Sequence, residues 1–159
     1  MDFETVLNDI KYREIGAGVL NAVKTLLKKD QYLLKVDSSE RSIQFRLAMY
    51  LQEQFPDKNV DVEYNRTKSV PKAIHPNDDP QNVFPDIIIH IRGTNNNLLA
   101  IEIKKDSNRE IKDKDIKKLK AYCEDENLQY SHGLFIKFGV ENDAGTVSEC
   151  EWVHAGQST

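Results

Sequence analysis

The sequence predicts an α/β (α+β) fold in which helices flank a mixed central β-sheet and a helical extension precedes the sheet. Two observations support this fold class. Short apolar runs rich in β-branched residues alternate with longer segments whose apolar residues recur at helical spacing. The elements follow the order helix, strand, strand, strand, helix, strand, which is typical of a sheet with helices packed against it. A chain of 159 residues is long enough for one such domain.

Composition narrows the class of protein. Apolar residues make up 39% of the chain and charged residues 30%, as in an ordinary globular protein. No apolar run approaches the roughly 20 residues that a membrane helix requires, and the charged N-terminus lacks the apolar core of a signal peptide. Cys123 and Cys150 are isolated, without the CxxC spacing of a zinc site. These observations predict a cytoplasmic protein that keeps its thiols reduced and has no membrane partner.

The N-terminal third is expected to consist of helices. Apolar residues at helical spacing predict helices over 3–13 and 17–29, and Gly16 and Gly18 mark the expected break between them. The stretch DSSE, which ends at Glu40, is typical of a helix start and predicts a helix over 40–55. Glu40 then lies in the first turn, where the helix dipole favours a carboxylate.

The rest of the chain supplies the predicted strands and one further helix. Residues 60–65 alternate between apolar and polar side chains and predict the first strand. Residues 66–83 contain three prolines and are expected to form a long loop. A helix is expected over about 110–125, followed by a buried strand over 130–138 and an edge strand over 146–154.

A β-hairpin over residues 84–105 is expected near the middle of the chain. Two apolar runs, 87–91 and 98–103, flank the polar segment GTNNN. Such punctuation between β-branched runs predicts two antiparallel strands around a turn, which we expect to be centred near Asn95. The hairpin matters for function because three charged side chains lie where its strands are otherwise apolar.

The expected register brings these charged residues, Asp86, Glu102 and Lys104, onto one face of the hairpin. It sets Asp86 opposite Lys104, and it sets Glu102 opposite Ile88, one step diagonally from Asp86. Opposite and diagonal neighbours lie roughly 5 to 8 Å apart at Cβ, close enough for two carboxylates to share one divalent cation. The alternative is a cross-strand ion pair of Lys104 with Asp86 or Glu102, worth about 0–1 kcal/mol and without a function.

Charge is distributed unevenly along the chain. The net charge of −4 argues weakly against a nucleic-acid partner, but residues 104–120 hold eight basic and four acidic side chains. This stretch directly follows the carboxylates and could hold phosphate groups. On charge alone, a solvated helix face of mixed charge is the simpler explanation.

These pieces together resemble the PD-(D/E)xK nuclease superfamily, the fold of many restriction enzymes and repair nucleases. The matching residues are Glu40 at a helix start, Pro85-Asp86, and Glu102-Ile103-Lys104, followed by a helix and a strand. The resemblance extends to small uncharacterised bacterial proteins with this motif set. It implies a single domain over 1–159, in which 1–37 form a helical extension, 38–138 a restriction-endonuclease-like core and 139–159 a C-terminal strand and tail.

The resemblance implies a catalytic set of Asp86, Glu102, Lys104 and Glu40. Asp86 and Glu102 would bind Mg²⁺, with Mn²⁺ as a substitute, and Glu40 would complete the metal-binding acids. Lys104 would lie beside the attacking water, where its charge orients that water or stabilises the transition state.

The resemblance also implies residues that contact nucleic acid. One branch of the superfamily carries a QxxxY motif on the helix after the hairpin. Here Lys118 and Tyr122 stand at these positions, one helical turn apart on a shared face, with lysine in place of glutamine. Together with Lys117 and Arg109, they are the residues expected to bind nucleic acid.

The sequence therefore predicts a Mg²⁺-dependent nuclease that hydrolyses phosphodiester bonds, with DNA as the expected substrate. A homodimer would suit an enzyme that cuts two strands. The alternative hypothesis is a catalytically inactive module of the same fold that binds nucleic acid or a protein partner, and it is consistent with the net acidity and the helical extension. A third hypothesis is a structural protein in which the charged trio is only an ion pair.

Overall fold

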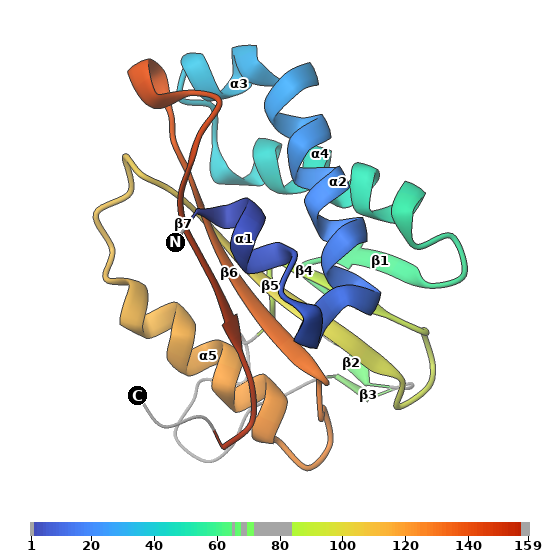
Figure 1. Cartoon of the computed structure of the whole chain (residues 1–159). Helices are drawn as coiled ribbons and strands as arrows, with labels where there is room; N and C mark the ends of the chain where they lie inside the picture. Colours follow the sequence, from blue (N-terminus) through green and yellow to red (C-terminus); the bar gives the residue numbers. More distant parts are fainter. Residues whose placement is uncertain (1, 65, 68–69, 72–83, 157–159) are drawn as a thin grey trace. The chain divides into compact units, whose positions relative to one another are not determined.

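The computed structural model describes residues 2–64, 66–67, 70–71 and 84–156. These residues form five α-helices, two short 3-10 helices and a five-stranded sheet in the order β1-β4-β5-β6-β7 (Figure 1). This mixture of helices and one main sheet confirms the predicted α+β class. Within the described part of the chain, no helix is both long enough and apolar enough to cross a membrane.

The sheet contains both antiparallel and parallel neighbours. Strands β1 (Asn59–Val62) and β4 (Ile87–His90) pair antiparallel, as do β4 and β5 (Asn97–Lys105). Strands β5 and β6 (His132–Phe138) run parallel, since Ser131 N–H donates to Asn97 O and Asp106 N–H donates to Phe138 O. Helix α5 (Lys112–Glu124) joins them, because parallel neighbours require a crossover connection. Strand β7 (Val147–Val153) lies at the edge of the sheet.

Most predicted elements are confirmed close to their expected bounds. The predicted helices over 40–55 and 110–125 correspond to α4 (Glu40–Gln54) and α5, and the predicted strands over 130–138 and 146–154 correspond to β6 and β7. Strand β1 is shorter than predicted because Glu63 adopts a φ of 48°, in the left-handed region, which ends the extended chain. Of the expected loop over 66–83, only Arg66–Thr67 (β2) and Val70–Pro71 (β3) are described, and they pair antiparallel.

The chain divides into two compact units that interleave along the sequence. The first unit comprises Met1–Asp57, Ile103–Glu110 and Ile136–Glu151, and the second comprises Lys58–Glu102, Ile111–Phe135 and Trp152–Thr159. Strands β5, β6 and β7 each contribute residues to both units. Neither this division nor the fold tests the single-domain expectation, which stays a prediction.

The first unit is built around two helices, α2 (Arg13–Lys29) and α4, which pack against each other. Both bury one apolar face, because their apolar side chains recur every three to four residues. The short helices α1 (Phe3–Leu7) and α3 (Gln31–Lys35) also contact α2. The fully buried side chains of this core include Leu7, Val19, Val23, Leu26, Leu34, Ile43, Leu47 and Leu51.

The predicted helix break at Gly16 and Gly18 is wrong. The 3-10 helix at Ile10–Tyr12 leads directly into α2, which continues through both glycines. A Cβ atom at Gly16 would meet the main-chain carbonyl of Leu7, and one at Gly18 would meet the Phe55 ring. The glycines therefore allow close packing against α2, and they do not end it.

We expect Gly16→Ala to lower the free energy of unfolding by about 1–3 kcal/mol, because the added methyl group overlaps backbone that cannot rotate away. Chemical denaturation would measure this change. Gly18→Ala is the matched control: its methyl group meets the Phe55 side chain at 2.8 Å, and a side chain can shift. Equal stability of the Gly16→Ala variant and the wild type would contradict the close approach of α1 to α2.

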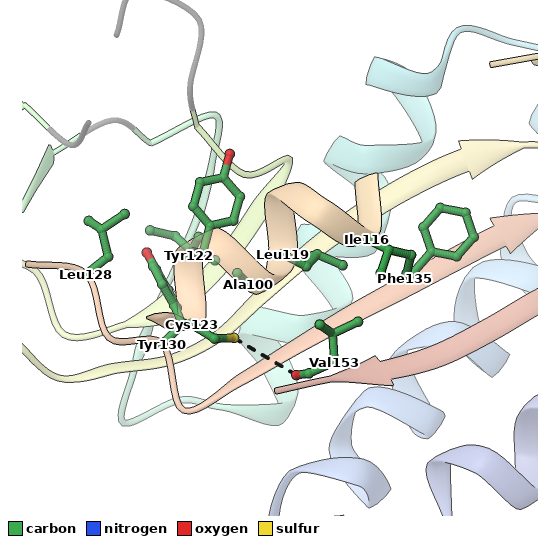
Figure 2. Packing of buried hydrophobic residues seen from close by; sticks show 10 residues of the cluster. Ala100, Ile116, Leu119, Tyr122, Cys123, Leu128, Tyr130, Phe135 and Val153 are labelled. Carbon is green, nitrogen blue, oxygen red and sulfur yellow. Dashed lines mark hydrogen bonds between the residues drawn. The ribbon is translucent and has the colours of Figure 1, made fainter. Parts of the chain in front are cut away.

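The second unit has its own apolar core between α5 and the strands (Figure 2). Helix α5 directs its apolar side chains to one face, as their spacing predicts. The core consists of Ile88, Ala100, Ile116, Leu119, Tyr122, Cys123, Leu128, Tyr130, Phe135 and Val153. Among the described residues, Cys123 and Cys150 are unpaired cysteines. Burial raises the pKa of the Cys123 thiol to about 11 and that of Cys150 to about 12.

Candidate functional site

The β4–β5 hairpin is confirmed, but its predicted register is wrong by two residues. Ile87 lies opposite Ile101 and Ile89 opposite Leu99, with a register shift between Ile89 and His90. The turn is centred before Asn95, because Thr94 N–H donates to Ile91 O and Ile91 N–H donates to Asn96 O. Gly93 supplies the positive φ of 72° that this turn uses.

Continuing the observed register places Asp86 opposite Glu102, where the sequence analysis had expected Lys104. A shift of two residues preserves the alternation of side chains, so both carboxylates keep the predicted face. Asp86 directly precedes β4, and Glu102 lies in β5. The corrected register therefore brings the two acids closer together than predicted.

Glu102 is the centre of a charged cluster in the second unit. It is only 2% exposed, and Lys118 Nζ on α5 lies 3.0 Å from Glu102 Oε1. Burial raises the pKa of Glu102 well above 4.5, and the negative charge of Asp86 raises this pKa further, followed by Asp115; the Lys118 ammonium opposes the shift. Three carboxylates and one ammonium thus act on one another within this unit.

The carboxylates of the same cluster keep the Lys118 side chain protonated. Burial is the largest single effect and lowers the pKa of Lys118, but the charge and the hydrogen bond of Glu102, together with the charges of Asp86 and Asp115, raise the pKa overall. The Lys118 side chain is 30% exposed. It therefore stays protonated at neutral pH and remains accessible from solvent.

Sequence reasoning placed Asp115 only in the mixed-charge stretch and missed its place beside Glu102. Asp115 is 4% exposed, in the first turn of α5. The sequence could have indicated this position, because Asp115 precedes Lys118 by three residues and residues three apart on a helix share a face.

The carboxylates Asp86 and Glu102 fit a hard divalent cation. Their charges repel each other, one of them is buried, and carboxylate oxygens are the ligands that Mg²⁺ prefers. Across residues 2–64, 66–67, 70–71 and 84–156, no group of three or more His, Cys, Asp or Glu side chains is arranged to hold a metal ion. Mg²⁺ commonly uses only one or two protein carboxylates and keeps several waters, so a pair of acids meets its requirement.

Lys104 lies in the first unit and pairs with an acid that the sequence analysis did not consider. It is 7% exposed, and its Nζ lies 3.0 Å from Glu110 Oε2. The Glu110 side chain is 59% exposed, so water weakens this ion pair. The predicted position of Lys104 beside an attacking water stays a prediction.

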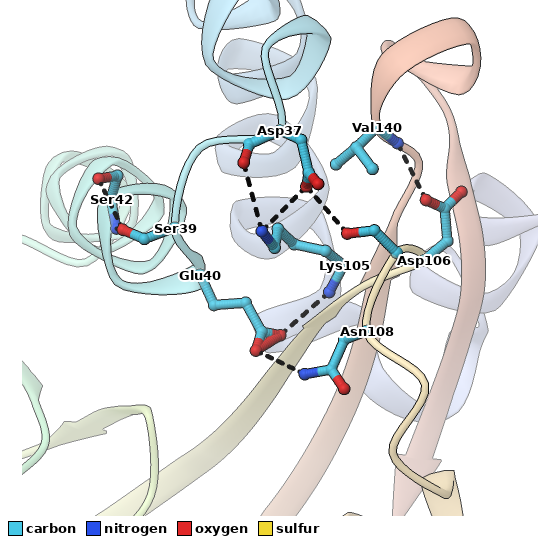
Figure 3. A network of polar contacts seen from close by, with 9 residues as sticks. Asp37, Ser39, Glu40, Ser42, Lys105, Asp106, Asn108 and Val140 are labelled. Atoms are coloured by element: carbon cyan, nitrogen blue, oxygen red, sulfur yellow. Dashed lines mark hydrogen bonds and ion pairs between the residues drawn. The ribbon is translucent and has the colours of Figure 1, made fainter.

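Glu40 begins α4 as predicted and links the start of this helix to the end of β5 and the segment that follows it (Figure 3). Ser39 caps the helix, since its Oγ accepts from Ser42 N–H at 3.2 Å. The Lys105 main-chain N–H donates to Glu40 Oε2 at 3.1 Å, and Asn108 Nδ2 donates to Oε1 at 2.8 Å. Both carboxylate oxygens of Glu40 thus bind groups of the first unit, and its role as a metal ligand stays a prediction.

The same segment is anchored a second time at Asp37. Lys105 Nζ lies 2.9 Å from Asp37 Oδ1, and Ser107 Oγ donates to Oδ1 at 2.9 Å. The hydrogen bond from Lys105, followed by that from Ser107, lowers the pKa of Asp37. The two anchors fix residues 105–108 against the start of α4.

The four residues expected to bind nucleic acid differ in their surroundings. Lys117 on α5 and Arg109 in the first unit are exposed, and Lys118 contacts Glu102. Tyr122 is fully buried, with its ring edge against Tyr130 at 6.4 Å between centroids. Its placement favours a packing role over the predicted contact with nucleic acid.

A second charged cluster in the second unit links β1 to the hairpin turn. His90 Nε2 lies 2.7 Å from Asp61 Oδ2, and Arg92 Nε donates to the same oxygen at 2.9 Å. Burial alone would raise the pKa of Asp61, but the hydrogen bonds from Arg92 and His90 lower it overall. His90 is 2% exposed, so this cluster is best explained as a structural tie.

No family model, no curated protein and no solved structure matches this chain. The fold and the geometry of the site therefore carry the functional argument.

Proposed function

We propose that this protein is a metal-dependent nuclease that hydrolyses phosphodiester bonds, with DNA as its substrate and Mg²⁺ or Mn²⁺ as its cofactor. The observation that carries the proposal is the pairing of Asp86 with the buried Glu102. Keeping two like charges together, one of them out of water, is costly unless a cation neutralises them. A divalent cation would neutralise both at once.

The roles of the residues follow from phosphodiester chemistry, in which water adds to an already anionic phosphorus. Asp86 and Glu102 would hold the metal ion, which when bound lowers the pKa of its water and neutralises the charge that develops. Lys104, two residues after Glu102 on β5, would orient the attacking water or stabilise the transition state. Lys118 would bind a phosphate oxygen, since its protonated and partly exposed ammonium suits an anion. Glu40 is proposed as a further acid on the strength of the resemblance alone.

A catalytically inactive module of the same fold is the second candidate, and one observation favours it. The Lys118 ammonium already neutralises one oxygen of Glu102, at 3.0 Å. If that ion pair is permanent, the acids need no metal, and the protein binds nucleic acid or a protein partner without cutting. The expected cytoplasmic setting and homodimer stay predictions under either candidate.

The proposal predicts that the protein cuts plasmid, linear or single-stranded DNA in the presence of Mg²⁺ or Mn²⁺, and that Asp86→Ala removes this activity. Gel analysis of the products measures the cutting and separates internal cleavage from trimming at ends. Asp113→Ala is the matched control, because Asp113 is an exposed acid in the first turn of α5 and should leave cleavage unchanged.

Equal cutting by the wild type and the Asp86→Ala variant would contradict the assigned site. Absence of cutting in both would favour the inactive module, and metal binding then decides between the candidates. Calorimetry with Mn²⁺ should show binding to the wild type and none to Glu102→Ala if the acids hold a metal. Equal binding to both proteins would mean that these acids are not the ligands.

A further inference from the structure

Two histidines lie together in the second unit, apart from the carboxylates. His132 is the first residue of β6, and His154 directly follows β7. Their ring centroids are 6.0 Å apart, and the Trp152 ring lies 6.2 Å from that of His132. Both histidines are half-buried, so each residue is partly accessible to solvent, while His132 Nδ1 itself is buried. Neither the proposed nuclease chemistry nor the acidic cluster uses this pair.

We propose that His132 and His154 bind one divalent transition-metal ion of the class of Cu²⁺, Ni²⁺ or Zn²⁺. Neutral imidazole is the common side-chain ligand for these ions, whereas Mg²⁺ prefers carboxylate oxygen and water. The histidine pair and the Asp86–Glu102 pair should therefore select different metals. The proposal stands independently of the nuclease proposal.

The separation of the two rings agrees with a shared ion. A metal–nitrogen bond of about 2.0–2.1 Å places the ion about 3.2 Å from each ring centroid. Two rings on one ion then have centroids roughly 5 to 6.4 Å apart, as the angle between the two bonds opens from tetrahedral to linear. The observed 6.0 Å falls within this range. Water would complete the coordination.

Aromatic packing is the competing explanation, because edge-to-face ring pairs also lie 4.5–7 Å apart. The rings of His132 and His154 are inclined at 72°, which packing accommodates equally well. The two explanations differ in one respect that an experiment can use. Phenylalanine can replace histidine in a ring contact but not at a metal ion.

Trp152 makes the test direct, because it is the only tryptophan in the chain and lies beside His132. Bound Cu²⁺ quenches the fluorescence of a neighbouring indole. We expect Cu²⁺ to quench Trp152 emission with saturation at one ion per chain, and EDTA to restore the emission. His132→Phe and His154→Phe should each weaken the apparent affinity at least ~10-fold. Millimolar Mg²⁺ should not compete with Cu²⁺.

Controls separate this result from misfolding and from the acidic site. Asp86→Ala should respond to Cu²⁺ like the wild type. His154→Gln is a second variant that removes the imidazole from a position outside the strand, with circular dichroism as the check on folding. Calorimetry with Zn²⁺ measures the same site without fluorescence.

Unchanged Cu²⁺ affinity in folded His132→Phe and His154→Phe variants would overturn the proposal. Quenching of the wild type that never saturates would do the same, because it would mean collisional contact with Cu²⁺ in solution. Either result would leave packing as the role of the pair. Neither would bear on DNA cleavage, since that test depends on Asp86.

Discussion

Glu102→Gln is expected to abolish Mg²⁺-dependent cleavage and, at the same time, to stabilise the fold at neutral pH. Glutamine keeps the shape of the side chain but removes the negative charge that a divalent cation requires, so cleavage should fall at least ~100-fold. The stabilisation arises because the amide avoids the cost of keeping a carboxylate buried beside Asp86. We expect a gain of about 1–3 kcal/mol in the free energy of unfolding at pH 7.

The pH dependence of stability provides a separate readout of the same residue. In the folded protein the pKa of Glu102 lies above 4.5, so the folded state binds the proton more tightly than the unfolded state does. Its contribution to stability is therefore fully present below about pH 4.5 and is lost as the pH rises through the folded pKa. Urea denaturation at a series of pH values should show this decline in the wild type and a flatter profile in Glu102→Gln.

An exposed acid serves as the control for this experiment. Glu126→Gln changes the same chemical group at an exposed position and should alter neither cleavage nor the pH profile. A Glu102→Gln variant that cuts DNA like the wild type would remove Glu102 from the metal site. A variant that is less stable than the wild type at pH 7 would mean that the ion pair with Lys118 outweighs the burial of the carboxylate.

Tyr122→Ala is expected to lower the free energy of unfolding by about 3–5 kcal/mol, because it removes a fully buried ring from the core of the second unit. Tyr122→Phe keeps the ring and should cost much less. Thermal or urea denaturation measures both changes. Lys117→Ala, on the exposed face of the same helix, should stay within about 0.5 kcal/mol of the wild type.

The Phe variant also decides between the two roles considered for Tyr122. If the residue only packs, Tyr122→Phe should bind DNA as the wild type does. A loss of DNA affinity in a folded Tyr122→Phe protein would restore the contact with nucleic acid that the QxxxY resemblance implies, through the phenolic hydroxyl.

Local sequence patterns predicted the elements whose ends are marked by particular residues, such as a helix cap or a proline. Helix α4 begins where Ser39 and Glu40 supply capping and dipole chemistry, and it ends before Pro56. The error at Gly16 arose because glycine has two meanings in a sequence, a helix end and a close approach of backbones, and only tertiary packing separates them. The short helix α3 was missed because five residues are too few to show a period.

The candidate site likewise contains one feature that local sequence patterns could predict and several contacts that they could not. The register assumed from the turn chemistry placed Glu102 on the face of Asp86, and this survived a register error of two residues because two is the period of a strand. The ion pair of Lys118 with Glu102 and the anchoring of Glu40 to Asn108 were not predicted, since both join segments that only the folded chain brings together. Sequence spacing within one element carries no information on such contacts.

The raised pKa values of the two cysteines bear on the chemical durability of the protein. The thiolate is the form of cysteine that reacts with oxidants and alkylating agents. With pKa values of about 11 for Cys123 and about 12 for Cys150, both sulfurs remain thiols at physiological pH. Folding thus shields Cys123, which is buried, from oxidation and from disulfide-linked aggregation, whereas Cys150 is only half-buried. Damage at Cys123 should therefore begin with molecules that have already opened.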